Sequence, residues 1–142
     1  TLGGASEEDC RKLRRFAVEL GLAFQLQDDL LDSYGDERLG KAIGGDILEG
    51  KKTYLMVTAM SRADEPTREI LRHTYRDATL TDAEKIARVK EVYDRLDIPR
   101  LTEQQISLRF ERALATLDSL SADPARTLRM REFAEGLMGR KK

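Results

Sequence analysis

Three aspartates stand close together in a stretch that is otherwise largely apolar. Residues 24–32 read Phe-Gln-Leu-Gln-Asp-Asp-Leu-Leu-Asp, so the carboxylates are those of Asp28, Asp29 and Asp32. At about 100° of rotation per residue of helix, all three fall within one arc of the helix surface, together with Gln25. The spacing therefore predicts a helix face that is lined with carboxylates.

The opposite side of the same helix is apolar. It carries Leu22, Ala23, Leu26 and Leu30, which we expect to pack in the interior. Aspartate is a poor helix former and neighbouring carboxylates repel one another, so the acidic face needs a compensating partner. Magnesium is commonly held by one or two carboxylates together with substrate phosphates. The pattern favours a site for a divalent cation and a phosphorylated substrate over the alternative, an ordinary solvated acidic face.

Two lysines flank the glycine-rich stretch that follows this helix. Lys41 comes directly after Gly40, and Lys51 comes directly after Gly50. We expect Lys51 at the start of a helix, where backbone N–H groups also favour anions. For a single lysine, a solvated surface position is the alternative interpretation.

Residues 24–54 resemble the second aspartate-rich region of the trans-isoprenyl diphosphate synthases, also called polyprenyl synthetases. The positions that carry the resemblance are Phe24, Gln25, Gln27, Asp28, Asp29 and Asp32, followed by Gly40-Lys41, Gly45-Asp46-Ile47 and Gly50-Lys51. The upstream segment 2–6 is similar to the loop that leads into this helix in the family. Beyond residue 60 the resemblance is to the family's C-terminal helices and is one of pattern only.

The resemblance implies a prenyltransferase with magnesium as its cofactor. Such an enzyme condenses isopentenyl diphosphate with an allylic prenyl diphosphate, which ionises with the help of the metal. The resemblance implies that Asp28, Asp29 and Asp32 hold the magnesium, with Asp28 as the direct ligand. Asp46 would either contact the metal through water or hold the loop.

The same resemblance implies which residues meet the substrates. Lys41 and Lys51 would reach the diphosphate of the allylic substrate. Gln25 would lie near the reacting allylic carbon, and Phe24 would line the site of isopentenyl diphosphate, with simple core packing as the alternative for Phe24. Asp28, Lys51 and Gln25 are therefore the residues implied in catalysis.

Enzymes of this family carry two aspartate-rich motifs, whereas this sequence contains a single Asp-Asp-x-x-Asp. We therefore expect residues 1–142 to be the C-terminal part of a single all-α prenyl synthase domain. We expect this fragment to be inactive alone and to self-associate through apolar faces, and the longer protein to be a homodimer. The residues that set product chain length in the family lie mainly near the first motif.

Other enzyme classes remain as alternatives. A class I terpene cyclase shares the ionisation chemistry, but its second metal motif mixes Asp or Asn with Ser, Thr and Glu. A non-catalytic subunit of a heteromeric synthase is the other alternative, although such subunits often lose their aspartate motifs. A carboxylate-bridged di-iron bundle would need Glu-x-x-His pairs, which the sequence lacks.

Composition is consistent with a prenyl synthase and restricts other classes. Lysine and arginine number 25 and aspartate and glutamate 26, giving a net charge of −1, so no nucleic-acid partner is expected. No apolar run approaches the roughly 20 residues that span a bilayer. Cys10 is the only cysteine, which excludes an internal disulfide and fits a reducing compartment. We expect a cytoplasmic protein.

The remaining sequence predicts helices separated by short turns, and therefore an all-α fold, the C-terminal part of an isoprenoid-synthase-type helical barrel or bundle. Helix starts are expected at the cap Ser6, near Lys51, at Pro66, at Pro124 and at the capping boxes Thr81-x-x-Glu84 and Thr102-x-x-Gln105. Helix ends are expected at Gly35 and near Met60, Leu96, Leu120 and Leu137. Residues 36–46 are expected to form a glycine-rich loop.

Overall fold

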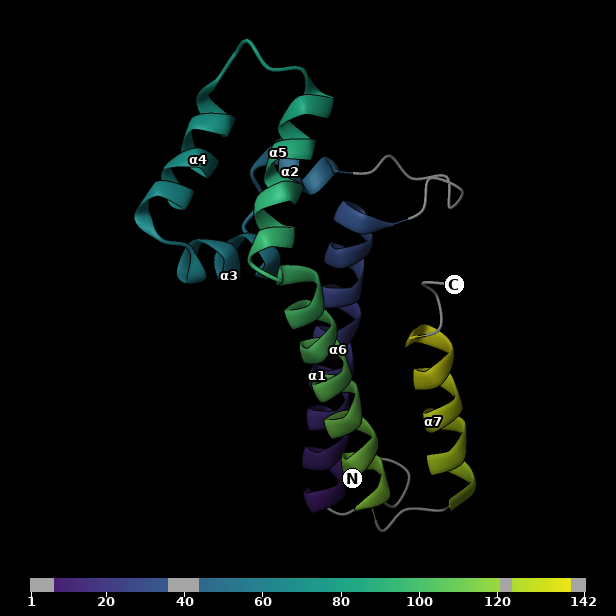
Figure 1. Ribbon diagram of the computed structural model, residues 1–142. Helices are drawn as coiled ribbons and strands as arrows, with labels where there is room; N and C mark the ends of the chain where they lie inside the picture. The colour runs from purple at the N-terminus through teal and green to yellow at the C-terminus, as the bar shows by residue number, and fades with distance from the viewer. Residues whose placement is uncertain (1–6, 36–43, 121–123, 139–142) are drawn as a thin grey trace. The chain divides into compact units, whose positions relative to one another are not determined.

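Helices are the regular structure of this protein. The computed structural model describes residues 7–35, 44–120 and 124–138, and no strand occurs in these ranges, so the expected all-α fold is confirmed. The helices in Figure 1 are α1 (Glu7–Tyr34), α2 (Gly45–Glu49), α3 (Tyr54–Arg62), α4 (Glu65–Arg76), α5 (Asp82–Arg95), α6 (Ile98–Asp118) and α7 (Pro124–Met138). Over the same ranges, no helix has the length and apolarity required to cross a membrane.

The contacts of the chain gather into two compact units. The first comprises residues 1–27 and 104–142, and the second comprises residues 28–103. The core of the first unit forms where α1, α6 and α7 pack together. Its buried members are Phe16, Leu20, Ala113, Leu117 and Ala134. The expectation of a single domain over residues 1–142 stays a prediction.

Helix α5 organises the second unit, because α2, α3 and α4 all pack against it. Val89, Val92 and Tyr93 of α5 are almost completely buried, as are Leu55 of α3 and Leu71 of α4. Burying such side chains is worth roughly 1.5–3 kcal/mol each relative to exposure. The second unit therefore has an apolar core that can support the polar groups at its surface.

Side-chain caps fix where several helices of the second unit begin. At α5 the predicted capping box is confirmed, since Glu84 N–H donates to Thr81 Oγ1 over 3.1 Å and Thr81 N–H donates to Glu84 Oε1 over 3.0 Å. At α4 the Asp64 carboxylate accepts from Thr67 N–H over 2.9 Å, with Pro66 in the first turn as predicted. These bonds satisfy backbone donors that the helix itself cannot pair.

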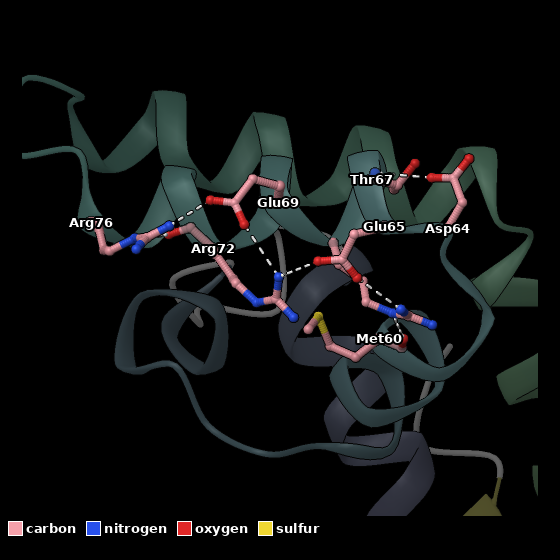
Figure 2. Close-up of polar contacts among 8 residues, drawn as sticks. Met60, Asp64, Glu65, Thr67, Glu69, Arg72 and Arg76 are labelled. Carbon is pink, nitrogen blue, oxygen red and sulfur yellow. Dashed lines mark hydrogen bonds and ion pairs between the residues drawn. The ribbon is translucent and has the colours of Figure 1, made fainter.

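Ion pairs cover the exposed side of α4, as Figure 2 shows. Arg72 donates to Glu65 over 2.8 Å and to Glu69 over 3.2 Å, and Arg76 donates to Glu69 over 2.7 Å. Arg68 also donates to the Met60 carbonyl over 2.9 Å, which joins α4 to the end of α3. These arginines are paired within the helix surface, so they give no indication of an anion site.

Three predicted boundaries are wrong. Thr102 does not begin a helix, because α6 starts at Ile98, where Pro99 suits the first turn, and Thr102 Oγ1 instead donates to the Ile98 carbonyl over 2.8 Å. Residues 45 and 46, predicted as the end of the loop, instead begin α2. The next helix starts at Tyr54, since Thr53 caps it, so Lys51 precedes the helix and is not its first residue. The predicted cap Ser6 lies outside the described residues.

Candidate functional site

The three aspartates of α1 lie in different surroundings although they are neighbours in sequence. Asp28 is exposed, Asp29 is 6% exposed, and Asp32 is half-buried. On the opposite side of the helix Ala23 and Leu30 are buried as predicted, whereas Leu22 is 42% exposed and does not pack inside. Solvent exposure therefore differs strongly among the three carboxylates of the acidic face.

Lys51 brings a positive charge to this face. Its Nζ lies 3.6 Å from Asp29 Oδ1 and 3.7 Å from Asp46 Oδ2. Asp29, and then Asp46, raises the pKa of the Lys51 ammonium, because both carboxylates favour the charged form. The structure thus brings together Asp29 and Lys51, which sequence analysis predicted as parts of one site. The Lys51 side chain is nevertheless 47% exposed, so part of it remains open to solvent.

Asp46 carries a pKa raised above the ordinary range for an aspartate. Burial is the largest cause and the nearby Asp32 carboxylate the next, while Lys51 opposes them. Negative charge is thus crowded around Asp29, Asp32 and Asp46, with a single lysine beside it among the described residues. Such a cluster favours any additional cation that approaches.

Asp32 contacts the start of α2. Its carboxylate Oδ2 accepts from the Asp46 backbone N–H over 2.8 Å, and its backbone carbonyl accepts from Gly44 N–H over 2.6 Å. Gly44 has φ +93°, a backbone conformation that favours glycine, and a Cβ built there would lie 2.5 Å from the Ile86 side chain. A glycine at position 44 therefore lets α2 approach both α1 and α5.

The end of α2 sets the position of Lys51. Gly50 has φ +66°, its N–H donates to the Ile47 carbonyl, and Lys51 N–H donates to the Asp46 carbonyl, each over 3.0 Å. This is the arrangement by which a left-handed glycine ends a helix. Sequence analysis missed α2, although the apolar Ile47 followed by Gly50 is a helix-end signal that could have revealed it.

Tyr34 holds the last turn of the aspartate helix against α5. Its hydroxyl donates to Asp94 Oδ1 over 2.9 Å, and Lys90 Nζ lies 4.8 Å from the centre of its ring. Burial, and then Asp94, raises the pKa of the Tyr34 hydroxyl, so it stays protonated as a donor. Nothing in the sequence pattern pointed to this pair, because the two residues are far apart along the chain.

The donor set suits magnesium bound with a substrate, not magnesium bound by protein alone. Within residues 7–35, 44–120 and 124–138, no group of three or more His, Cys, Asp or Glu side chains is arranged to hold a metal ion. Magnesium commonly takes one or two carboxylates and completes its octahedron with water and phosphate oxygens. Oxygen donors from Asp28 and its neighbours fit that mode of binding.

Phe24, Gln25 and Lys41 are the remaining residues that the sequence predicts for the site. Phe24 is half-buried and Gln25 is exposed, and both lie in the first compact unit. Lys41 lies outside the described residues, as do Gly40 and the segment 2–6. The roles expected for Phe24, Gln25 and Lys41 stay predictions.

Comparison with known protein families finds a match that covers both the aspartate helix and α2. The family model described as polyprenyl synthetase matches residues 1–96, which include both features. This chain belongs to the polyprenyl synthetase family. Farnesyl pyrophosphate synthase from Homo sapiens is 33% identical over 116 residues, which are 82% of this chain and 27% of that protein.

Solved structures of polyprenyl synthetases share the fold. A crystal structure of geranylgeranyl pyrophosphate synthase is 32% identical with a TM-score of 0.83, over 98% of this chain and 44% of that one. Geranylgeranyl pyrophosphate synthase from Corynebacterium glutamicum, complexed with isoprenyl diphosphate and magnesium, is 34% identical with a TM-score of 0.80, over 96% and 39%. The chain thus spans less than half the length of these relatives.

Proposed function

We propose that this chain supplies the second aspartate-rich motif of a prenyltransferase that condenses isopentenyl diphosphate with an allylic prenyl diphosphate. The observation that carries the proposal is the Lys51 ammonium, held beside Asp29 and Asp46 at the motif of a polyprenyl synthetase. The relative from Corynebacterium glutamicum that is complexed with isoprenyl diphosphate and magnesium supports both ligand classes. No described feature favours the terpene cyclase or the non-catalytic subunit.

In the proposed reaction the chain's own groups bind charge and place the diphosphate. The allylic C–O bond breaks, and the diphosphate leaves with the electron pair. The double bond of isopentenyl diphosphate then forms the new C–C bond, and the proton lost from the resulting cation goes to the released diphosphate. Asp28, with Asp29 and Asp32 nearby, would hold magnesium, which would supply positive charge to neutralise the leaving diphosphate. Lys51 adds a fixed positive charge, which costs no reorganisation during the reaction.

The remaining assignments are part of the same proposal. Gln25 lies near the allylic carbon, Lys41 reaches the diphosphate, and Phe24 lines the isopentenyl diphosphate site. Because the chain spans between a quarter and a half of the relatives' length, the first aspartate motif would come from the rest of a longer protein. That protein is proposed to be a cytoplasmic homodimer.

Magnesium-dependent binding of inorganic pyrophosphate tests the proposal on this chain directly. Titration calorimetry should show binding to the wild type with magnesium, and Asp28→Asn should weaken it by about tenfold or more, because the substitution removes a charge and leaves the size unchanged. Absence of binding to the wild type would contradict the proposal.

Condensation tests the activity itself. A protein that carries this chain together with the rest of a relative's length should convert radiolabelled isopentenyl diphosphate and an allylic diphosphate to a longer prenyl diphosphate. Asp28→Asn should lower kcat by about 10² to 10³, the usual effect of losing a stabiliser of developing charge. A kcat within about threefold of the wild type would show that Asp28 does not serve the metal.

A further inference from the structure

Asp32 makes contacts that a metal ligand does not need. Its side chain and its backbone both accept hydrogen bonds at the start of α2. The Asp46 N–H, in the first turn, donates to Oδ2 over 2.8 Å, and the N–H of Gly44, just before the helix, donates to the backbone carbonyl over 2.6 Å. Gly44, the residue before α2, has no side chain with which to cap the helix. The carboxylate of Asp32, which belongs to α1, therefore caps the start of α2.

The Asp32 carboxylate also lies close to Gly45, the first residue of α2. A Cβ at Gly45 would lie 3.5 Å from Asp32 Oδ1, an ordinary van der Waals distance, so the carboxylate sits against the backbone of α2. Asp32 is half-buried at this position, whereas Asp28, one turn earlier on the same helix, is exposed. The two carboxylates are thus in different situations although both belong to one motif.

Two hydrogen bonds and an ion pair, all involving Asp46, connect Asp32 to Lys51. The Asp46 N–H is held by Asp32, the Asp46 carbonyl accepts from Lys51 N–H over 3.0 Å, and the Asp46 carboxylate lies 3.7 Å from Lys51 Nζ. Loss of the Asp32 contact would release the start of a helix that has only five residues. A helix this short has little stability of its own.

We propose that Asp32 is a positioning residue, which caps α2 and thereby holds Asp46 and Lys51 beside Asp29. It is not a ligand that the metal requires. The expected effect on pyrophosphate binding rests on the proposed function, because that function places Lys51 at the diphosphate. The capping of α2 does not rest on it.

Three variants separate capping from metal binding. Asparagine caps helices about as well as aspartate, because its side-chain oxygen still accepts from a backbone N–H. Asp32→Asn should therefore preserve α2, and Asp32→Ala should release it. Asp28→Asn is the matched control, since it removes the same charge one turn away from an exposed position.

Amide hydrogen exchange of the 142-residue chain, followed by NMR, reads the state of α2 without any ligand. Asp32→Ala should speed exchange at Asp46, Leu48 and Lys51 by about fivefold or more, as expected for loss of a cap. Asp32→Asn and Asp28→Asn should stay within about twofold of the wild type. Unchanged exchange in Asp32→Ala, or equal acceleration in Asp32→Asn, would overturn the proposal.

Pyrophosphate binding with magnesium then distinguishes this inference from the proposed function. Asp28→Asn should lose most of the affinity, whereas Asp32→Asn should keep it within about threefold. Equal losses in the two asparagine variants would make Asp32 a metal ligand and overturn the inference. If the wild type does not bind pyrophosphate, the proposed function fails, while the exchange data still decide whether Asp32 caps α2.

Discussion

At the scale of single residues, Lys51 joins carboxylates that come from two different helices. Asp29 belongs to α1 and Asp46 to α2, and the ammonium lies within 4 Å of both. Ion pairs with a half-exposed lysine add little to stability, because water screens them. Lysine is charged at neutral pH at its ordinary pKa, and the two carboxylates raise the pKa of Lys51 further. The pairing therefore matters for where the charge is placed, and much less for folding.

Replacing Lys51 should therefore affect ligand binding more than stability. Lys51→Ala should weaken magnesium-dependent pyrophosphate binding by about tenfold or more, because it removes a charged hydrogen-bond donor. Lys52→Ala is the matched control, since Lys52 is also exposed and has no described ion pair with these carboxylates, and it should stay within about twofold. Calorimetric titration of both variants checks the difference. If both substitutions weakened binding equally, the overall positive charge of this segment would be what binds pyrophosphate, and not the placement of Lys51.

Helical periodicity was enough to predict that Asp28, Asp29 and Asp32 share a face, and the residues around them identified the family. Periodicity could not predict which carboxylate is buried. That depends on α2 and Lys51 returning to α1, and the path of a chain through a glycine-rich stretch is not set by local preferences. The pairing of Tyr34 with Asp94 escaped prediction for the same reason: it joins distant parts of the chain.

At the scale of elements, the same capping-box pattern had opposite outcomes at Thr81 and Thr102. Thr81 begins α5 with both reciprocal bonds. Thr102 lies inside α6, because the chain turns at Asp97 (φ +63°) and Pro99 then fits the first turn. An earlier start signal thus overrode a later one. Capping motifs locate helix ends correctly only where no competing signal lies a few residues upstream.

The cap at Thr81 should make a measurable contribution to the second unit. Thr81→Ala leaves the Glu84 N–H without its partner, so we expect a loss of about 1 kcal/mol in the free energy of unfolding. Ser107→Ala, at an exposed position inside α6, should change it by less than about 0.5 kcal/mol. Urea denaturation followed by circular dichroism compares the two variants. A Thr81→Ala variant as stable as Ser107→Ala would show that water replaces the cap.

The cap at Asp64 should make stability depend on pH. Hydrogen bonds from Thr67 lower the pKa of the Asp64 carboxyl below its ordinary range. A group whose pKa is lower in the folded than in the unfolded state stabilises the fold above its unfolded pKa, and this contribution is lost as the pH falls through the folded pKa. Asp64→Asn keeps an acceptor without the titration. Its free energy of unfolding should therefore fall less than that of the wild type between about pH 5 and about pH 2.

Urea denaturation at several pH values measures the free energy of unfolding of Asp64→Asn and of the wild type. Asp64→Asn should approach the wild type at the acid end, where the wild-type carboxyl is protonated, and differ from it most near neutral pH. Parallel curves for the two proteins over the whole range would show that the ionised carboxylate contributes nothing through this cap.

At the scale of the whole molecule, large apolar side chains remain on the surface. Phe133 and Leu128 of α7 are 62% and 55% exposed, and Val18 of α1 is 60% exposed. Scattered exposed apolar residues are normal, but two large apolar side chains exposed on the same helix favour association with another surface. The relatives are about two to three times as long as this chain, which is consistent with additional helices covering such faces.

The isolated chain should therefore self-associate. We expect sedimentation equilibrium to show a mass that rises with concentration, and the double variant Leu128→Ser, Phe133→Ser to shift the chain toward monomer, because it removes apolar area. Arg129→Ser is the matched control, as an exposed polar position on the same helix. A wild type that stays monomeric throughout would contradict the prediction. A double variant that associates as strongly as the wild type would place the contact elsewhere.

The tight fit of Gly44 restricts how this protein can evolve. A larger residue at position 44 meets two independent obstacles, the positive φ and the Ile86 side chain that occupies the space of its Cβ. Besides glycine, asparagine and aspartate tolerate such a backbone best, and either would still require the Ile86 side chain to move or to be replaced. Positions 44 and 86 are therefore coupled, so we expect a larger residue at position 44 to be tolerated better when Ile86 is replaced by a smaller residue.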